Sequence, residues 1–331
     1  AVKNSSSNII PKNNVVIATR VGLGKVCFIK DDTAINQDLR GVVPKDASKL
    51  SADYLFWWFK SIAHIIEQNG TGATVQGVKL PFVKGLEIPL PPPAEQKRIV
   101  KKLNDVFEKV SKAKEAVEKN LQNSKELFES YLQSVFANPG KDWEEKKLGD
   151  IGKVSMCKRV FKQQTTKTGD IPFYKIGTFG KKPDAFISNE IYKVFRKKYS
   201  FPKKGDILLS ASGTIGRRVR YDGEPAYFQD SNIVWIDNDE KQVLNGYLYQ
   251  VYGACNWSPA KGATISRLYN ANLRQIEIVF PKSLVEQKTI VKKLEMLSAE
   301  TKKLEKIYEQ KLADLEELKK AVLQEAFAGH I

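Results

Sequence analysis

The stretch Glu95-Gln96-Lys97-Arg98-Ile99-Val100-Lys101-Lys102-Leu103 recurs 191 residues later as Glu286-Gln287-Lys288-Thr289-Ile290-Val291-Lys292-Lys293-Leu294. Two further matches lie upstream at nearly the same spacing: Val15–Thr19 with Ile207–Ala211 at an offset of 192, and Gly72–Val75 with Gly262–Ile265 at an offset of 190. Offsets that stay this constant along the chain indicate an internal repeat. The sequence therefore predicts a duplication.

Each copy ends in a long stretch without proline or glycine, 94–137 in the first and 284–328 in the second. Apolar or small residues recur there in alternating steps of four and three, with one 4-4 step at the equivalent position of each stretch, which is typical of a coiled coil with a stutter. Two matched seams predict an antiparallel helix pair, about 65 Å long at 1.5 Å per residue. We expect the packed positions to include Leu103, Val110, Val117, Tyr131, Leu294, Leu304 and Leu315.

Local signals mark the start of each helix. Ser283 and Glu286 have the Ser-x-x-Glu spacing of a capping box. Pro91-Pro92-Pro93 stiffens the chain just ahead of the first helix.

The remaining segments have the pattern of short strands with some helix. Turn residues at Asp222-Gly223-Glu224-Pro225 separate two apolar runs of strand length. The expected strands are Ile207–Ser210, Arg218–Tyr221 and Ile233–Ile236, and the expected core helices are Tyr54–Lys60 and Tyr247–Tyr252.

These patterns predict an α+β fold with two strand-rich domains and a long antiparallel two-helix coiled coil. The predicted parts are a partial first domain at 1–93, a first coiled-coil helix at 94–138, a second domain at 139–283 and a second coiled-coil helix at 284–331.

The two copies differ in length. About 50 residues of the second copy, within 142–205, have no counterpart in the first, and they include Lys158, Arg159 and Lys175. Residues 1–14 are rich in serine, asparagine and lysine, a composition that predicts disorder.

Charge gives the first indication of a partner. The 331-residue chain carries 54 Lys and Arg against 38 Asp and Glu, a formal net charge of +16. An excess of this size suggests a polyanion, with nucleic acid first.

The same composition speaks against several classes of protein. No apolar run of 18 residues and no basic-then-apolar leader is present, so we expect neither a membrane span nor a secretory signal. The three cysteines lie about a hundred residues apart, which argues against a disulfide framework or a zinc knuckle and fits a reducing cytoplasm.

Catalytic motifs are not evident in the sequence. Pro183-Asp184 and the two Glu-Gln-Lys triplets resemble nuclease elements, but the triplets begin long helices and lack the strand context. Val21-Gly22-Leu23-Gly24-Lys25 lacks the third glycine of a nucleotide-binding turn and is better read as a tight turn, although a phosphate cradle stays open as an alternative. Two histidines leave little for histidine catalysis. We therefore expect no catalytic, metal or cofactor site.

Basic and small polar residues gather instead in the turns of both copies. Hydroxyls and Lys or Arg side chains fix phosphates, whereas Arg and Gln can read guanine and adenine edges. Gln37 and Gln229 are candidate base readers, with the alternative that these turns are merely solvated. The candidate DNA-binding residues are Thr19, Arg20, Lys25, Gln37, Thr74, Lys158, Lys175, Ser212, Thr214, Arg217, Arg218, Gln229, Thr264, Ser266 and Arg267.

At this point the chain resembles a known family. A strand-rich module runs through Ile88-Pro89-Leu90-Pro91-Pro92-Pro93 into Glu95-Gln96-Lys97 and a long helix, and the arrangement repeats with Ile276-Glu277-Ile278-Val279-Phe280-Pro281 and Glu286-Gln287-Lys288. This is similar to the specificity subunit of type I restriction-modification systems. Gly205-Asp206-Ile207-Leu208-Leu209-Ser210 resembles the target-recognition domains of that family.

The resemblance implies that the antiparallel helix pair separates the two strand-rich domains, which are related by a pseudo-twofold axis. Two target-recognition domains would each read half of a bipartite site in double-stranded DNA, and the helices would set the spacer. The subunit would lack catalysis and dock methyltransferase and restriction subunits, which would carry S-adenosylmethionine, ATP and Mg²⁺. The short first domain departs from the family pattern. A coiled-coil scaffold and a stand-alone nucleic-acid-binding regulator remain as alternatives.

Overall fold

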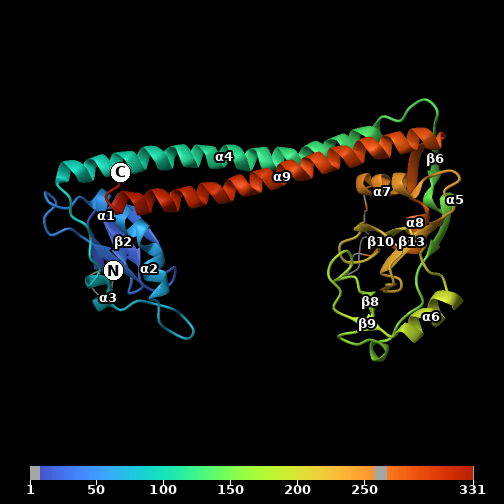
Figure 1. The fold of residues 1–331 in the computed structure, drawn as a ribbon, viewed down its shortest axis with the longest axis horizontal. Helices are drawn as coiled ribbons and strands as arrows, with labels where there is room; N and C mark the ends of the chain where they lie inside the picture. The colour runs from blue at the N-terminus through green and yellow to red at the C-terminus, as the bar shows by residue number, and fades with distance from the viewer. Residues whose placement is uncertain (1–7, 256, 258–266, 331) are drawn as a thin grey trace. The chain divides into compact units, whose positions relative to one another are not determined.

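The computed structural model describes residues 8–255, 257 and 267–330, which divide into two compact units. Unit 1 comprises residues 1–122 and 306–331, and unit 2 comprises residues 123–305. The long helices α4 (Pro93–Ala137) and α9 (Leu284–Phe327) contribute to both units (Figure 1). Each unit therefore joins a globular part to a length of helix pair.

Unit 1 is built on an antiparallel sheet of order β3-β2-β5, beside a two-stranded ribbon of β1 and β4. Helix α1 packs on the sheet with Leu55, Trp58 and Phe59 against Val15 and Ile17. The element bounds are β1 Asn8–Ile10, β2 Asn14–Ala18, β3 Val26–Ile29, β4 Thr33–Ile35, β5 Leu39–Val42, α1 Ala52–Ser61, α2 Ala63–Gln68 and α3 Leu80–Lys84.

Unit 2 contains a four-stranded antiparallel sheet of order β11-β10-β13-β7, a three-stranded sheet β12-β8-β9 and a pair β14-β6. Helix α7 lies beside β10 and β11 (Figure 1). The strand bounds are β6 Trp143–Lys147, β7 Gly152–Ser155, β8 Ile171–Tyr174, β9 Phe186–Ile187, β10 Ile207–Ser210, β11 Arg218–Arg220, β12 Tyr227–Phe228, β13 Ile233–Asn238 and β14 Glu277–Pro281. The short helices are α5 Leu148–Ile151, α6 Asn189–Lys198, α7 Asn245–Ala254 and α8 Asn270–Arg274.

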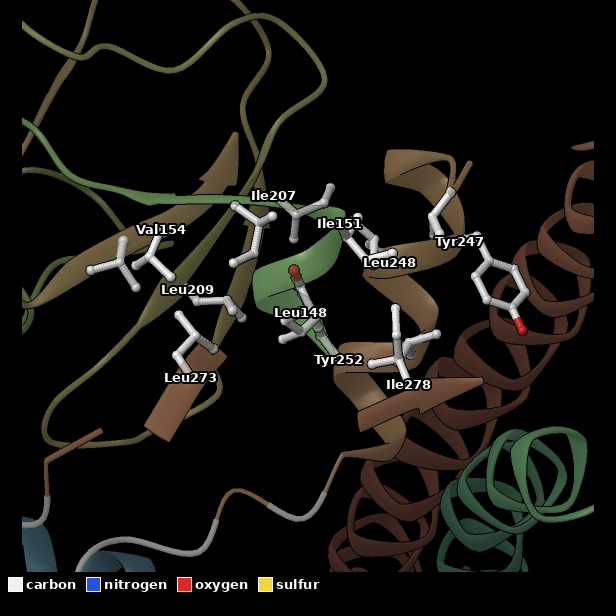
Figure 2. Close-up of a cluster of buried hydrophobic side chains, with 14 of the residues drawn as sticks. Leu148, Ile151, Val154, Ile207, Leu209, Tyr247, Leu248, Tyr252, Leu273 and Ile278 are labelled. Atoms are coloured by element: carbon white, nitrogen blue, oxygen red, sulfur yellow. The ribbon is translucent and has the colours of Figure 1, made fainter. Parts of the chain in front are cut away.

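One hydrophobic core of unit 2 lies between the four-stranded sheet and α7. Figure 2 shows Leu148 of α5 among Leu209, Tyr252 and Ile278, side chains that come from four separate elements. All of them are buried. This short helix thus contributes as directly to the core as the strands do.

The glutamine of the Glu-Gln-Lys triplet makes equivalent hydrogen bonds in each of the two copies. In unit 1 the buried Gln96 side chain accepts from the Ser51 N–H through Oε1 at 3.0 Å. Its Nε2 donates to the carbonyls of Lys49 at 2.6 Å and Pro91 at 2.9 Å. The side chain thereby ties the helix start to two loops of the domain.

Gln287 repeats this arrangement in unit 2. Its Oε1 accepts from the Leu244 N–H at 2.9 Å, and Nε2 donates to the carbonyls of Gln242 and Pro281, both at 2.8 Å. The duplication expected from the sequence is therefore confirmed at the level of single hydrogen bonds.

Replacing Gln287 by alanine is expected to lower the free energy of unfolding by about 3 kcal/mol, because it leaves buried backbone groups without partners. Gln324, on an exposed face of α9, provides the matched control, and Gln324→Ala should change stability by less than about 0.5 kcal/mol. Urea unfolding of both variants measures the difference. Equal midpoints would show that the hydrogen bonds of Gln287 contribute nothing net.

The two long helices run antiparallel within each unit. In unit 1, Ile99 and Leu103 near the start of α4 pack with Leu323 and Ala326 near the end of α9. In unit 2, Phe136 near the end of α4 and Ile290 near the start of α9 pack on the same core. Lys114 and Glu316 form an ion pair at 2.9 Å between the helices of unit 1.

The predicted seam is correct at most positions and wrong at two. Leu103, Val110 and Leu294 are buried, and Val117 and Leu315 are half-buried. Leu304 and Tyr131, however, are 38% and 40% exposed.

Helix geometry explains both errors. At about 100° per residue, Leu304 lies about 80° around the helix from Leu294, whereas residue 305 lies only about 20° away. In α4, the buried Leu132 lies four residues after the half-buried Phe128, and Tyr131, three residues after it, is turned about 100° away from Leu132. Each seam thus takes a four-residue step where the sequence interpretation placed a three-residue step.

Two further expectations are modified. Ser283 caps α9, since its Oγ accepts from the Glu286 N–H at 3.3 Å, but the Glu286 carboxylate accepts from Trp143 Nε1 at 3.0 Å and so does not complete the capping box. Disorder over 1–14 is wrong for residues 8–14, because β1 pairs with β4 and Ile10 packs on a small cluster of apolar residues. Among the described residues, no helix is both long and apolar enough to cross a bilayer.

Candidate nucleic-acid interface

A tight turn between β12 and β13, formed by Gln229–Asn232, is the centre of the candidate site. Ser231 has a φ of 53°, in the left-handed region, and the Asn232 N–H donates to the Asp230 carbonyl at 2.6 Å. Asp230 also accepts from Arg159 Nε at 2.8 Å. The turn is thus fixed by its own backbone and by a cation from the segment that the first copy lacks.

A cavity of about 720 Å³ opens beside this turn. Its apolar lining includes Val160, Phe173 and Ala185. Its polar lining consists of Arg159, Lys162, Thr165, Thr166, Lys167, Lys175, Asp184, Gln229, Asp230, Ser231 and Asn232. Basic side chains outnumber acidic ones by four to two, so the cavity favours an anion.

The two acidic side chains of the cavity are already paired. Arg159 binds Asp230, and Lys175 binds Asp184 with Nζ 2.9 Å from Oδ1. Within the described part of the chain, no ion pair engages Lys162 or Lys167. These two lysines are therefore the cations available to a phosphate.

Gln229 lines the cavity with an amide of fixed orientation. Its Oε1 accepts from the Ile176 N–H at 2.9 Å, and its own N–H donates to the Tyr174 carbonyl at 2.9 Å. Because a backbone N–H must face an oxygen, the orientation of the amide is fixed and Nε2 is directed elsewhere. An amide NH₂ group held in this way matches guanine N7 and O6 or thymine O4 in the major groove.

Four of the predicted residues of the second copy converge on this turn. Lys175 and Gln229 line the cavity. Arg267 Nη2 donates to the Ser231 carbonyl at 3.2 Å, and the Ser212 hydroxyl donates to Asn232 Oδ1 at 2.8 Å. Ser212 is buried, so the prediction that it contacts DNA is wrong, because its hydroxyl holds the turn instead.

Other predicted residues lie away from the cavity. Arg218 stacks 4.6 Å from the Tyr249 ring, and a Cβ at Gly253 would collide with its guanidinium, so it is packed against α7 and not placed to contact DNA beside Gln229. Arg217 Nη1 donates to the Phe179 carbonyl at 3.0 Å and supports a loop. Lys158 lies over the Tyr199 ring at 5.2 Å.

One predicted residue, Thr214, lies in a neighbouring turn. Thr214 is exposed, and its carbonyl accepts a hydrogen bond from the Ser210 hydroxyl. Thr264 and Ser266 lie outside the described residues.

In the first copy, Gln37-Asp38 is equivalent to Gln229-Asp230, and the cation beside this turn comes from within the repeat. Arg20 Nη1 lies 3.6 Å from Asp38 Oδ1, where the second copy uses Arg159. Gln37, Lys25 and Thr74 are exposed on the adjoining loops. The tight turn expected before Lys25 is present, with Gly22 and Gly24 at φ of 74° and 79°.

Thr19 corrects a second prediction. Its side chain is buried, and its hydroxyl donates to the Asp38 carbonyl at 3.2 Å. The residue therefore closes the turn from inside and does not face a ligand.

The sequence interpretation missed Lys162, Lys167 and Asn232. The two lysines could have been found because they lie in the segment within 142–205 that has no counterpart in the first copy. Asn232 carried no signal, because only the folded turn brings it to Ser212 and Ala211.

Burial raises the pKa of the Cys157 thiol to about 12, so the thiol stays protonated at neutral pH and is a poor nucleophile. Across the described residues, no three His, Cys, Asp or Glu side chains gather as a metal site.

Comparison with known proteins identifies the family of this chain. Residues 1–122 and 140–314 match the family described as the type I restriction modification DNA specificity domain. A Haemophilus influenzae protein described as a type I restriction enzyme specificity subunit, S.HindORF215P, is 65% identical over 144 residues, which cover 44% of this chain and 37% of that protein. The Methanocaldococcus jannaschii type I restriction enzyme MjaIX specificity subunit is 26% identical over 319 residues, covering 87% of this chain and 72% of that one.

Two solved structures share the fold. One belongs to work on complex assembly and conformational transition of the type I R-M system, with a TM-score of 0.83, 20% identity and coverage of 99% of this chain and 85% of that one. The HsdS subunit from Thermoanaerobacter tengcongensis has a TM-score of 0.61, 19% identity and coverage of 98% and 82%. The family match spans both copies of the repeat, and the chain belongs to the type I restriction modification DNA specificity domain family.

Proposed function

We propose that this chain is the non-catalytic DNA-recognition subunit of a type I restriction-modification complex. Its two copies would each read one half of a bipartite site in double-stranded DNA, and α4 and α9 would set the unread spacer. The observation that carries the proposal is the basic cavity beside the Gln229–Asn232 turn, which combines lysines for phosphate with an oriented amide for a base edge.

The second copy would supply most of the discrimination between sequences. Most of the cavity wall comes from residues 159–185, within the segment that has no counterpart in the first copy. Among the described residues of the first copy, Arg20, Gln37 and Thr74 lie on exposed loops.

The chemistry would lie on partner subunits. The methyltransferase subunits would bind S-adenosylmethionine, and the restriction subunits would use ATP and Mg²⁺. The complex would act in the cytoplasm, where the DNA substrate is found. The helix pair would provide the docking surface.

Mapping of methylated adenines tests this function. The chain is co-expressed with the methyltransferase subunit encoded beside it, in a host without other adenine methylation. We expect adenine methylation confined to one bipartite motif. Random methylation, or a motif unchanged when the chain is omitted, would contradict the proposal.

A charge reversal in the cavity sharpens this experiment. Lys162→Glu should reduce methylation of the motif at least about tenfold, the equivalent of one lost charge-assisted contact worth about 1.5 kcal/mol. Lys204→Glu, an exposed lysine of the same unit that does not line the cavity, should leave methylation near the wild-type level. The same loss in both variants would indicate a general charge effect.

A further inference from the structure

Another cavity of unit 2, of about 550 Å³, is enclosed by β11, α7 and the helix pair. Its walls come from 125–129 of α4, from Arg218, from Tyr249 and Gln250 and from 295–305 of α9. Helix α7 lies beside α9 here (Figure 1). The cavity shares no lining residue with the one beside the Gln229–Asn232 turn, so it is a separate site.

Arg218 is an uncompensated cation in this cavity. Its side chain is half-buried, and its Nε is buried without a hydrogen-bond partner. Within the described residues, no carboxylate forms an ion pair with the guanidinium, and its Nη atoms donate no hydrogen bond. Burying a guanidinium without an anion or an acceptor costs free energy. A bound anion would remove that cost.

Helix α7 fixes the orientation of this guanidinium. Its Cζ lies 4.6 Å from the centroid of the Tyr249 ring, on which the group stacks. Gly253 leaves room for it, because a Cβ at that position would collide with Nη2. Stacking engages the face of the guanidinium and leaves the N–H groups at its edge free to donate. Arg218 thus offers a preformed fork of donors, which matches the oxygens of a phosphate or a carboxylate.

Gln250 adds an unpartnered amide to the same cavity. This α7 side chain is only 3% exposed and lines the cavity, yet among the described residues its amide makes no hydrogen bond. Buried polar groups without a partner are rare, which indicates that a ligand completes the site. Lys125 and Lys302, both exposed, supply two more cations from α4 and α9.

The acidic side chains of the cavity do not take the place of this anion. Glu295 is engaged by Arg220, whose Nη2 lies 3.2 Å from Glu295 Oε1. Glu129 is exposed and Glu305 is half-buried, and within the described part of the chain neither pairs with Arg218. The donors of Arg218 and Gln250 therefore remain available to an anion from outside the chain.

We propose that this cavity binds a phosphate group, with Arg218 and Gln250 as its principal donors. A phosphate has enough acceptor oxygens to bind the guanidinium fork, the amide and a lysine together. The group would belong either to a phosphorylated small molecule or to the backbone of DNA. The inference goes beyond base recognition and does not depend on the cavity beside Gln229.

NMR of the arginine side chains tests this inference in the full chain. The protein is labelled with ¹⁵N-arginine, and inorganic phosphate is titrated at constant ionic strength while the Nε–H signals are followed. We expect the Arg218 signal to shift until it saturates, because its guanidinium gains an anion. The Arg220 signal is the internal control. It should stay in place, since Arg220 is already paired with Glu295.

A matched pair of variants measures the contribution of Arg218. Arg218 and Arg220 both lie over the Tyr249 ring, and methionine keeps an apolar stem at either position. Calorimetric titration should show phosphate binding weakened at least about tenfold in Arg218→Met, because a charge-assisted contact is lost. Arg220→Met should bind phosphate as the wild type does.

A second NMR titration with duplex DNA separates the two sources of the phosphate. An Arg218 signal that shifts with the duplex would identify a backbone phosphate, and one that shifts with inorganic phosphate alone would identify a small molecule. A wild-type Arg218 signal that moves with neither ligand would overturn the proposal. Equal phosphate affinity in Arg218→Met and the wild type would overturn it as well.

Discussion

The affinity of this protein for duplex DNA, with its methyltransferase partner present, is expected to fall by roughly 10³–10⁵-fold between 50 and 200 mM salt. This range corresponds to neutralisation of about six to ten phosphates and release of their counterions. The net charge of +16 and the lysines of the cavity are the physical basis. Fluorescence anisotropy with a labelled duplex at several salt concentrations measures the slope.

A cavity variant links that slope to the structure. Removing the charge of Lys167 should reduce the slope by about one unit if this side chain meets a phosphate. If the affinity of the wild-type protein for duplex DNA did not change with salt concentration, electrostatic attraction would not be the main contribution to binding.

An aspartate at Leu294 is expected to unfold unit 2 or to lower its stability by several kcal/mol, since it would place an unpaired charge in a fully buried position. Leu103→Asp should have the same effect in unit 1, because Leu103 is equally buried. Thermal unfolding followed by circular dichroism provides the measurement.

Leu304→Asp is the matched control for these variants. The side chain is 38% exposed, so the charge stays in water and stability should change by about 0.5 kcal/mol or less. A loss at Leu304 as large as that at Leu294 would contradict the helix register described here.

The main lines of the fold could be predicted because they depend on regular spacing. The duplication, the two long helices and the strands Ile207–Ser210 and Ile233–Ile236 all follow from repeats or periodicity, and the structure confirms them. Leu304 and Tyr131 were misplaced because small angular offsets accumulate along a helix, and the sequence does not show which step corrects them.

The candidate site was less predictable, since it depends on contacts between distant segments. The parallel pairing of β12 with β8 brings Gln229 beside Lys175, and no local sequence pattern predicts that pairing. Thr19 and Ser212 were misread for a related reason: a hydroxyl that closes a turn has the same sequence context as one that binds phosphate.

The role of the glutamine in the repeated triplet could not be predicted from the sequence either. Its recurrence was evident from the sequence, but its function as a buried tie to three backbone groups appears only in the folded chain. Recurrence identified the position, and geometry supplied the role.

The cavity beside Gln229 is expected to read bases. The direct measurement is binding of Gln229→Ala to a panel of single-base variants of the mapped site, with methyltransferase subunits present and Gln37→Ala as the equivalent change in the first copy. We expect Gln229→Ala to lose about 1–3 kcal/mol at one or two base pairs and to leave the remaining positions unchanged. Equal losses across the panel, or a stronger change of base preference in Gln37→Ala, would contradict the account.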